Sequence, residues 1–278
     1  MLANEIPYDD FGGRGSVLHF AHANAYPPGV YRSLIRALAK DYRVLAVHHR
    51  PLWPGSEPEE IDDWRPIAED LLRFLDQMHL EHVIGVGHSL GAVTTMMAAL
   101  ERPEIFRALV LIEPVFLPPT VLDLLVANAT FDEPAEMPIA GRARRRHNRW
   151  PSQEAAFGHF RSKRVFDRWS DTSLWDFVRH GTTADAEGGI RLSYSPEWEA
   201  RIYSSVPTDV WDQIPRLTHP TLAMRGAESD TLTDESWELW QKKQPQAKFE
   251  VFVHAGHLLP LERPDEVAAR IAGFVSEM

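Results

Sequence analysis

A single serine stands between two glycines where the sequence changes from an apolar run to helix-forming residues. His82–Gly87 predicts a strand and Ser89–Leu100 predicts a helix. A serine in such a sharp turn exposes its hydroxyl, and Gly87 and Gly91 leave room for the backbone to pass closely. The Leu90 amide is expected at the helix N-terminus, where unpaired N–H groups favour negative charge. The stretch therefore predicts a nucleophile with an oxyanion-binding amide beside it.

The elements that must position this serine alternate along the chain. Strands are predicted at Ser16–Ala21, Tyr42–Val47, His82–Gly87, Ala108–Ile112, Thr221–Met224 and Lys248–Val253. Helices are predicted at Val30–Lys40, Ile61–Met78, Ser89–Leu100, Asp234–Lys243 and Pro264–Val275. This alternation, with continuously apolar strands, predicts an α/β fold with a mostly parallel central sheet flanked by helices.

The alternation stops in the middle of the chain. We interpret residues 115–206 as a mostly helical cap, or lid, inserted after the strand that ends near Ile112. Residues 1–114 and 207–278 then form the core. The insertion is rich in tryptophan and in arginine.

Composition narrows the function classes. Acidic residues outnumber basic ones by 40 to 29, which gives a net charge of −11 and argues against nucleic-acid or anionic-membrane binding. The chain has no cysteine, so a thiolate nucleophile and a cysteine metal site are excluded. No signal-peptide pattern and no apolar run of membrane-spanning length is present, so we expect a cytoplasmic protein.

With these motifs, the sequence resembles the α/β-hydrolase superfamily in its lidded, serine-nucleophile, esterase- or lipase-like branch. The stretch VLHFAHANAYPP resembles the family's strand and His-Gly loop, with His22-Ala23 in place of His-Gly. The resemblance implies that the backbone amide of Asn24 is the second oxyanion donor beside that of Leu90. His22 itself is either a substrate contact or a structural histidine bonded to nearby backbone.

The resemblance also implies the two partners of the serine. PTLAMRGAESDTLTDES matches the family's loop that carries an acid, with Asp230 at the matching position, while Glu228 and Glu113 are alternatives. FVHAGHLLPLERPDEV matches the last strand and loop and indicates His257 as the base, with His254 structural. Ser89, Asp230 and His257 follow the chain order of this fold.

This triad would hydrolyse an acyl group through a covalent acyl-enzyme, without a metal or organic cofactor. We expect cleavage of a small or medium carboxylic ester. Carbon–carbon bond hydrolysis, lactone hydrolysis and perhydrolysis use the same triad and remain alternatives. A further alternative is a receptor of this fold that binds a small molecule and turns it over slowly. His48 and His49 are adjacent on a strand and point to opposite faces, which argues against a metal site.

Substrate selection is expected in the cap. Candidate substrate contacts are His22, His88, Trp150 and Trp175. The aromatic residues either line an apolar pocket or pack the core of the cap. The arginines between Arg142 and Arg168 either bind an anionic substrate group or form a solvated face that pairs with acidic residues. The expected partner is an apolar acyl substrate, and the expected state is a monomer or homodimer.

Overall fold

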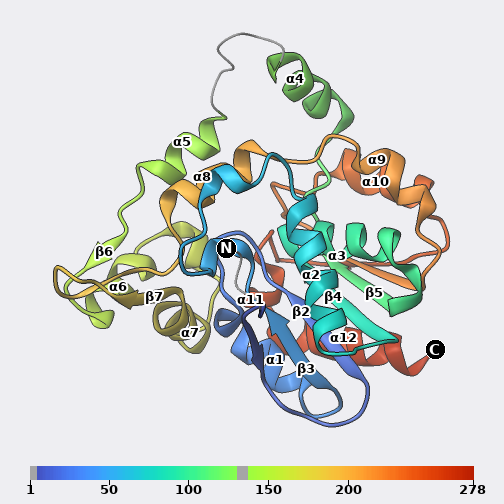
Figure 1. Ribbon diagram of the computed structural model, residues 1–278, viewed down its shortest axis with the longest axis horizontal. Helices are drawn as coiled ribbons and strands as arrows, with labels where there is room; N and C mark the ends of the chain where they lie inside the picture. The colour runs from blue at the N-terminus through green and yellow to red at the C-terminus, as the bar shows by residue number, and fades with distance from the viewer. Residues whose placement is uncertain (1–4, 130–136) are drawn as a thin grey trace.

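The structure is a computed structural model that describes residues 5–129 and 137–278. A seven-stranded sheet crosses the molecule in the order β1-β3-β2-β4-β5-β9-β10 (Figure 1). Its strands are β1 (Tyr8–Asp10), β2 (Val17–Ala21), β3 (Arg43–Val47), β4 (Val83–His88), β5 (Phe106–Ile112), β9 (Thr221–Gly226) and β10 (Lys248–Phe252). Neighbouring strands are parallel except for β1 and β3. The predicted α/β fold, with helices flanking a mostly parallel sheet, is confirmed.

Both faces of the sheet are buried because its strands are apolar on both sides. In β5, Leu109 and Leu111 belong to one apolar cluster, while Val110 and Ile112 belong to the other. This period of two follows from the alternation of side chains along a strand. The first cluster is covered by α2 (Arg65–Gln77), α3 (Leu90–Glu101) and α10 (Asp234–Lys243). The second is covered by α1 (Arg32–Leu38) and α12 (Pro264–Ser276).

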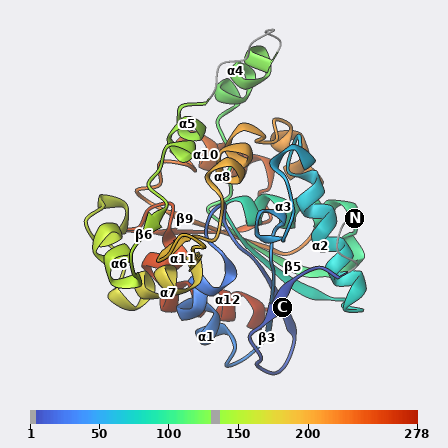
Figure 2. The ribbon, with the colours of Figure 1, turned by 60° about the vertical axis from the view of Figure 1, so that its left-hand side comes forward.

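The chain between β5 and β9 builds a separate layer beside the carboxyl ends of the strands (Figures 1 and 2). Its elements are α4 (Pro119–Ala129), α5 (Pro138–Arg144), β6 (Arg149–Trp150), α6 (Gln153–Arg161), α7 (Asp171–Gly181), β7 (Thr182–Ala184), β8 (Ile190–Leu192) and α8 (Pro196–Ser204). The next helix, α9 (Val210–Gln213), packs in the first apolar cluster of the sheet instead. In both ribbon views α4 stands away from the rest of the molecule.

Shorter elements complete the fold. The helix α11 (Leu259–Glu262) precedes α12. Single 3₁₀ turns lie at Pro28–Tyr31, Arg50–Leu52, Pro58–Glu60, Pro103–Ile105, Arg164–Phe166 and Ile214–Arg216. In the described part of the chain, no helix combines the length and apolar character needed to cross a membrane.

The structure differs from the sequence-based expectation in several elements. Strand β1 was not predicted, and neither was the small antiparallel sheet β6-β8-β7. These strands have two or three residues each, too few to show a period of two. The helix expected from Ile61 begins at Arg65, although Ile61 and Trp64 are still buried against the sheet.

Candidate active site

The turn between β4 and α3 holds Ser89 in a strained conformation. Its φ of 56° and ψ of −117° are rarely adopted by residues other than glycine. A Cβ added to Gly87 would lie 2.3 Å from the Gly91 oxygen, and one added to Gly91 would lie 2.1 Å from the Ala21 oxygen. Both contacts are far too short, so the two glycines are required by the close approach of neighbouring backbone.

A histidine and a glutamate are aligned with this serine. His257, in the loop after β10, lies with Nε2 3.0 Å from Ser89 Oγ. Its Nδ1 lies 3.1 Å from Glu113 Oε2. In the neutral ring, Nδ1–H donates to the carboxylate and Nε2 accepts from the serine hydroxyl, which is the geometry of an activated nucleophile.

Glu113 comes directly after β5 and is completely buried, with 0% exposure. Its φ is positive, at 49°, and its side chain reaches the end of β9. There Oε1 accepts from the Gly226 amide at 2.6 Å and Oε2 accepts from the Ser229 hydroxyl at 2.6 Å. With the imidazole N–H as a third donor, the carboxylate has the partners that a buried charge requires.

The structure therefore corrects the predicted acid. Asp230 does not contact His257: its side chain is exposed and accepts a 3.4 Å hydrogen bond from Thr231 Oγ1. Glu228 is also exposed and pairs with Arg168. Sequence reasoning kept Glu113 as an alternative but missed Ser229, which lies next to Asp230 and points its hydroxyl at Glu113.

The two predicted oxyanion donors border the same cavity as Ser89. Leu90 is the first residue of α3, so its amide has no acceptor within the helix. Asn24 lies after β2, where its side-chain Nδ2 donates to the Glu199 carbonyl of α8 at 3.1 Å. This bond ties the loop after β2 to the layer above the sheet.

A buried hydrogen-bond chain joins the three loops around Ser89. The Ala23 amide donates to Tyr31 Oη at 3.2 Å, and Tyr31 Oη donates to His88 Nδ1 at 2.7 Å. His88 Nε2–H then donates to the His257 carbonyl at 2.8 Å. Burial holds the pKa of His88 well below its usual value, so the ring stays neutral and can accept on Nδ1. Tyr31 was not foreseen, because only the fold brings it to the elbow.

His22 and His88 are not substrate contacts in this structure, because both are fully buried and bonded internally. His22 donates from Nδ1 to the Ala23 carbonyl at 2.8 Å, and its Nε2 accepts from the His49 amide at 3.2 Å. His49 Nε2–H donates in return to the His22 carbonyl at 3.0 Å. Burial lowers the pKa of His22 far below its usual value and that of His49 to about 4. The bonded pair fixes the loop after β2.

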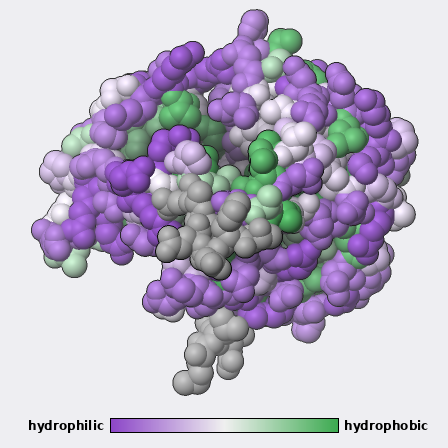
Figure 3. Space-filling view, turned by 90° about the horizontal axis from the view of Figure 1, so that it is seen from above, coloured by the Kyte–Doolittle hydropathy of each residue, from purple (hydrophilic) through white to green (hydrophobic). Residues whose placement is uncertain are grey.

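A cavity of about 400 Å³ opens above Ser89. Its described lining is mostly apolar: Ala23, Asn24, Tyr26, Trp64, Ser89, Leu90, Val115, Leu117, Met137, Ile139, Val165, Ile202, Tyr203, Val206, Asp230, Thr231, His257 and Leu258. Seen from above, the surface is hydrophilic over most of its area and hollowed near the middle, where hydrophobic side chains gather (Figure 3). An apolar cavity with a few polar groups is typical of a small-molecule site.

The predicted contacts Trp150 and Trp175 lie outside this lining. Trp150 packs on Phe160 with ring centroids 4.9 Å apart, and Trp175 stacks on Phe157 at 4.5 Å. Each of these tryptophans therefore packs against another aromatic ring of the cap segment. The packing interpretation therefore holds for both tryptophans.

Arginines of the cap segment pair with acidic residues. Arg146 binds the buried Glu199, and Arg149 contacts Asp185 and Glu187. Neither arginine lines the cavity above Ser89. The ion-pairing interpretation thus holds for these two residues.

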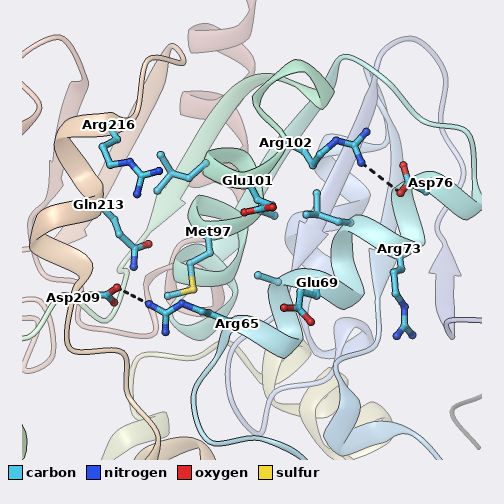
Figure 4. Close-up of a pocket in the computed structure, with 14 residues that line it drawn as sticks. Arg65, Glu69, Arg73, Asp76, Met97, Glu101, Arg102, Asp209, Gln213 and Arg216 are labelled. Carbon is cyan, nitrogen blue, oxygen red and sulfur yellow. Dashed lines mark hydrogen bonds and ion pairs between the residues drawn. The ribbon is translucent and has the colours of Figure 1, made fainter.

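A larger cavity, of about 580 Å³, lies away from the serine between α2, α3 and the turn Ile214–Arg216 (Figure 4). Its charges largely neutralise one another, as in the pairs Arg65–Asp209 and Arg102–Asp76. Ser89, His257 and Glu113 do not border this cavity. The size of a cavity alone therefore does not identify the candidate active site.

The histidines considered for a metal have other partners. His48 Nε2 lies 3.0 Å from Asp9, and His49 bonds to His22. Among the described residues, no group of three or more metal-ligating side chains converges.

Comparison with known proteins agrees with the fold. Residues 17–264 match the alpha/beta hydrolase fold family, and the chain belongs to that family. It is 22% identical to 2-(acetamidomethylene)succinate hydrolase of Mesorhizobium japonicum over 264 residues, which cover 95% of this chain and 89% of that protein. It is 32% identical to strigolactone esterase RMS3 of Pisum sativum over 107 residues, which span 36% of this chain and only 39% of that protein.

Solved structures share the fold at low identity. E-2-(acetamidomethylene)succinate hydrolase superposes with a TM-score of 0.78 at 21% identity, covering 98% of this chain and 95% of that one. The esterase Rv0045c of Mycobacterium tuberculosis superposes with a TM-score of 0.73 at 20% identity, covering 99% and 89%.

Proposed function

We propose that this protein is a serine hydrolase that cleaves small or medium carboxylic esters through a Ser89–His257–Glu113 triad. The observation that carries the proposal is the unbroken hydrogen-bond line from Ser89 Oγ through His257 to Glu113, at 3.0 and 3.1 Å, below an apolar cavity. Esterases among the proteins of similar fold support the choice of an ester.

The reaction begins when Ser89 attacks the acyl carbonyl while His257 Nε2 takes the hydroxyl proton. The oxygen of the tetrahedral intermediate accepts hydrogen bonds from the amides of Leu90 and Asn24. His257 returns the proton to the leaving alcohol, and an acyl-enzyme remains on Ser89. Water, deprotonated by His257, then releases the acid and restores the serine.

Glu113 contributes in this scheme by holding the imidazole in the tautomer with a proton on Nδ1 and by stabilising the cation that forms. A carboxylate fixed by Gly226 and Ser229 can do so without moving. We further propose that residues 1–114 and 207–278 form the catalytic core and that residues 115–206 form a cap that selects the substrate.

The test is a panel of p-nitrophenyl esters, lactones and diketones assayed with the wild type and Ser89→Ala. We expect rapid multiple turnover of p-nitrophenyl butyrate, with a loss of kcat of at least about 10⁴-fold in the variant. Mass spectrometry after a fluorophosphonate probe should place the adduct on Ser89. Turnover of only lactones or diketones would replace the ester assignment, and hydrolysis that survives in Ser89→Ala would refute the mechanism.

A further inference from the structure

Asp230 is a carboxylate at the active-site cavity that the triad does not use. It lines the cavity together with Ser89 and His257, and its side chain is exposed. Its neighbour Ser229 touches the Glu113 oxygen that faces His257, so Asp230 lies one residue from the catalytic hydrogen-bond line. Among the described residues, Asp230 has no ion-pair partner. Its charge is therefore free to act on whatever enters the cavity.

Among the described lining residues, no lysine or arginine side chain offsets this charge. Two arginines near its walls are paired with acidic residues, since Arg146 binds Glu199 and Arg168 binds Glu228. Glu113 adds a second negative charge below the serine when His257 is neutral, and the whole chain carries a net charge of −11.

We propose that Asp230 is a specificity-determining residue that makes the cavity select uncharged and cationic substrates and reject carboxylated ones. This inference rests on the proposed hydrolase function and defines its substrate class. The apolar walls take the carbon chain of the acyl group, while Asp230 attracts an ammonium and repels a carboxylate carried on that chain. Because the residue is exposed, water screens the interaction, and we expect about a tenfold effect on kcat/KM for each charge type.

The test compares three p-nitrophenyl esters of equal chain length: hexanoate, the adipate half-ester and 6-aminohexanoate. At pH 7.5 these acyl chains end in a methyl group, a carboxylate and an ammonium. For the wild type we expect kcat/KM to fall in the order ammonium, methyl, carboxylate, with about a hundredfold ratio between the two charged esters. Asp230→Asn should reduce that ratio at least about tenfold, and Asp230→Glu should preserve it.

Glu228→Gln is the matched control, because Glu228 is an exposed carboxylate of the same loop that lies outside the cavity lining and pairs with Arg168. Its ratio should equal that of the wild type. Equal rates for the two charged esters, or an equal change in Glu228→Gln and Asp230→Asn, would overturn the proposal.

The design separates this inference from the proposed function. Hydrolysis of the neutral hexanoate that depends on Ser89 tests the function, whereas the charge ratio tests Asp230. If no ester is hydrolysed, calorimetry can measure the affinities of Ser89→Ala for hexanamide, adipamate and 6-aminohexanamide. We expect these affinities to fall in the same order: ammonium, methyl, carboxylate. Adipamate binding as tightly as 6-aminohexanamide would then refute the role of Asp230.

Discussion

Two carboxylates that follow neighbouring strands of the sheet have opposite surroundings. Glu113, after β5, is completely buried and accepts from a backbone amide, a hydroxyl and an imidazole. Asp230, in the loop after β9, is exposed and borders an apolar cavity. A position directly after a strand brings each carboxylate to the site. The hydrogen-bond donors around the carboxylate then determine its role. We propose that Glu113 serves the chemistry and Asp230 the choice of substrate.

The largest effect expected from this comparison is that of Glu113→Gln. An amide keeps the shape of the side chain but loses the charge that stabilises the imidazolium and fixes its tautomer. We expect kcat for p-nitrophenyl butyrate to fall about 10³- to 10⁴-fold, with a much smaller change in KM. A loss of less than about tenfold, with the fold intact by circular dichroism, would show that another acid supports His257.

Removing one donor from Glu113 should have a smaller effect. Ser229→Ala deletes the 2.6 Å hydrogen bond to Oε2 and leaves the other two partners in place. Because a hydrogen bond to a charged group contributes about 1.5–3 kcal/mol, we expect kcat to fall on the order of tenfold. The control is Ser173→Ala, which removes a buried hydroxyl that bonds to Ser170 Oγ and lies outside the cavity lining. Equal losses of activity in both variants would contradict a specific role for Ser229.

A still smaller loss is expected from Tyr31→Phe, which acts on the loops rather than on the acid. The variant leaves His88 Nδ1 buried without its donor and frees the Ala23 amide. We expect kcat to fall roughly threefold and the free energy of unfolding to fall by about 1–3 kcal/mol. Tyr42→Phe is the control, since Tyr42 packs in the same apolar cluster. An equal fall in kcat in both variants would show that the hydroxyl of Tyr31 does not position the site.

The buried histidines should affect how stability depends on pH rather than the rate of hydrolysis. Burial lowers the pKa of His19 to about 3 and that of His49 to about 4, from an unfolded value of 6.5. Below pH 6.5 the unfolded chain binds protons that the folded chain does not, so stability is lost as pH falls toward these values. From pH 6.5 to 5.0 each such histidine should cost about 2 kcal/mol in the free energy of unfolding.

Urea unfolding at pH 7.5 and pH 5.0 measures this loss. Both ring nitrogens of His19 lack a partner among the described residues, so His19→Leu should recover about 2 kcal/mol of the difference between the two pH values. A pH dependence identical to that of the wild type would mean that His19 does not titrate as its burial requires.

Part of this site could be predicted from the sequence because the signals are local. The strand, turn and helix around Ser89 follow from periodicity and from two glycines, and Asp234–Lys243 was predicted with the bounds that the structure gives. His257 follows a strand in the same local way. The sequence pattern could not rank Glu113 above Asp230, because the ranking depends on Ser229 and Gly226, which reach Glu113 only across the sheet.

The cavity could not be predicted for a related reason. Its walls combine residues that lie in or next to β2, α3, α5 and α8, and these elements are far apart in the sequence. Trp150 and Trp175, which were predicted to contact substrate, instead pack on Phe160 and Phe157. Composition shows that such rings are present but not which side of a layer they face.

The most direct measurement of the central claim is the rate at which a neutral fluorophosphonate labels Ser89, followed by intact-protein mass spectrometry. Labelling requires the activated serine but no turnover, so it reports the hydrogen-bond line itself. We predict that Glu113→Gln slows labelling at least about a hundredfold more than Asp230→Asn does. A greater loss in Asp230→Asn than in Glu113→Gln would contradict the assignment of Glu113 as the acid of the triad.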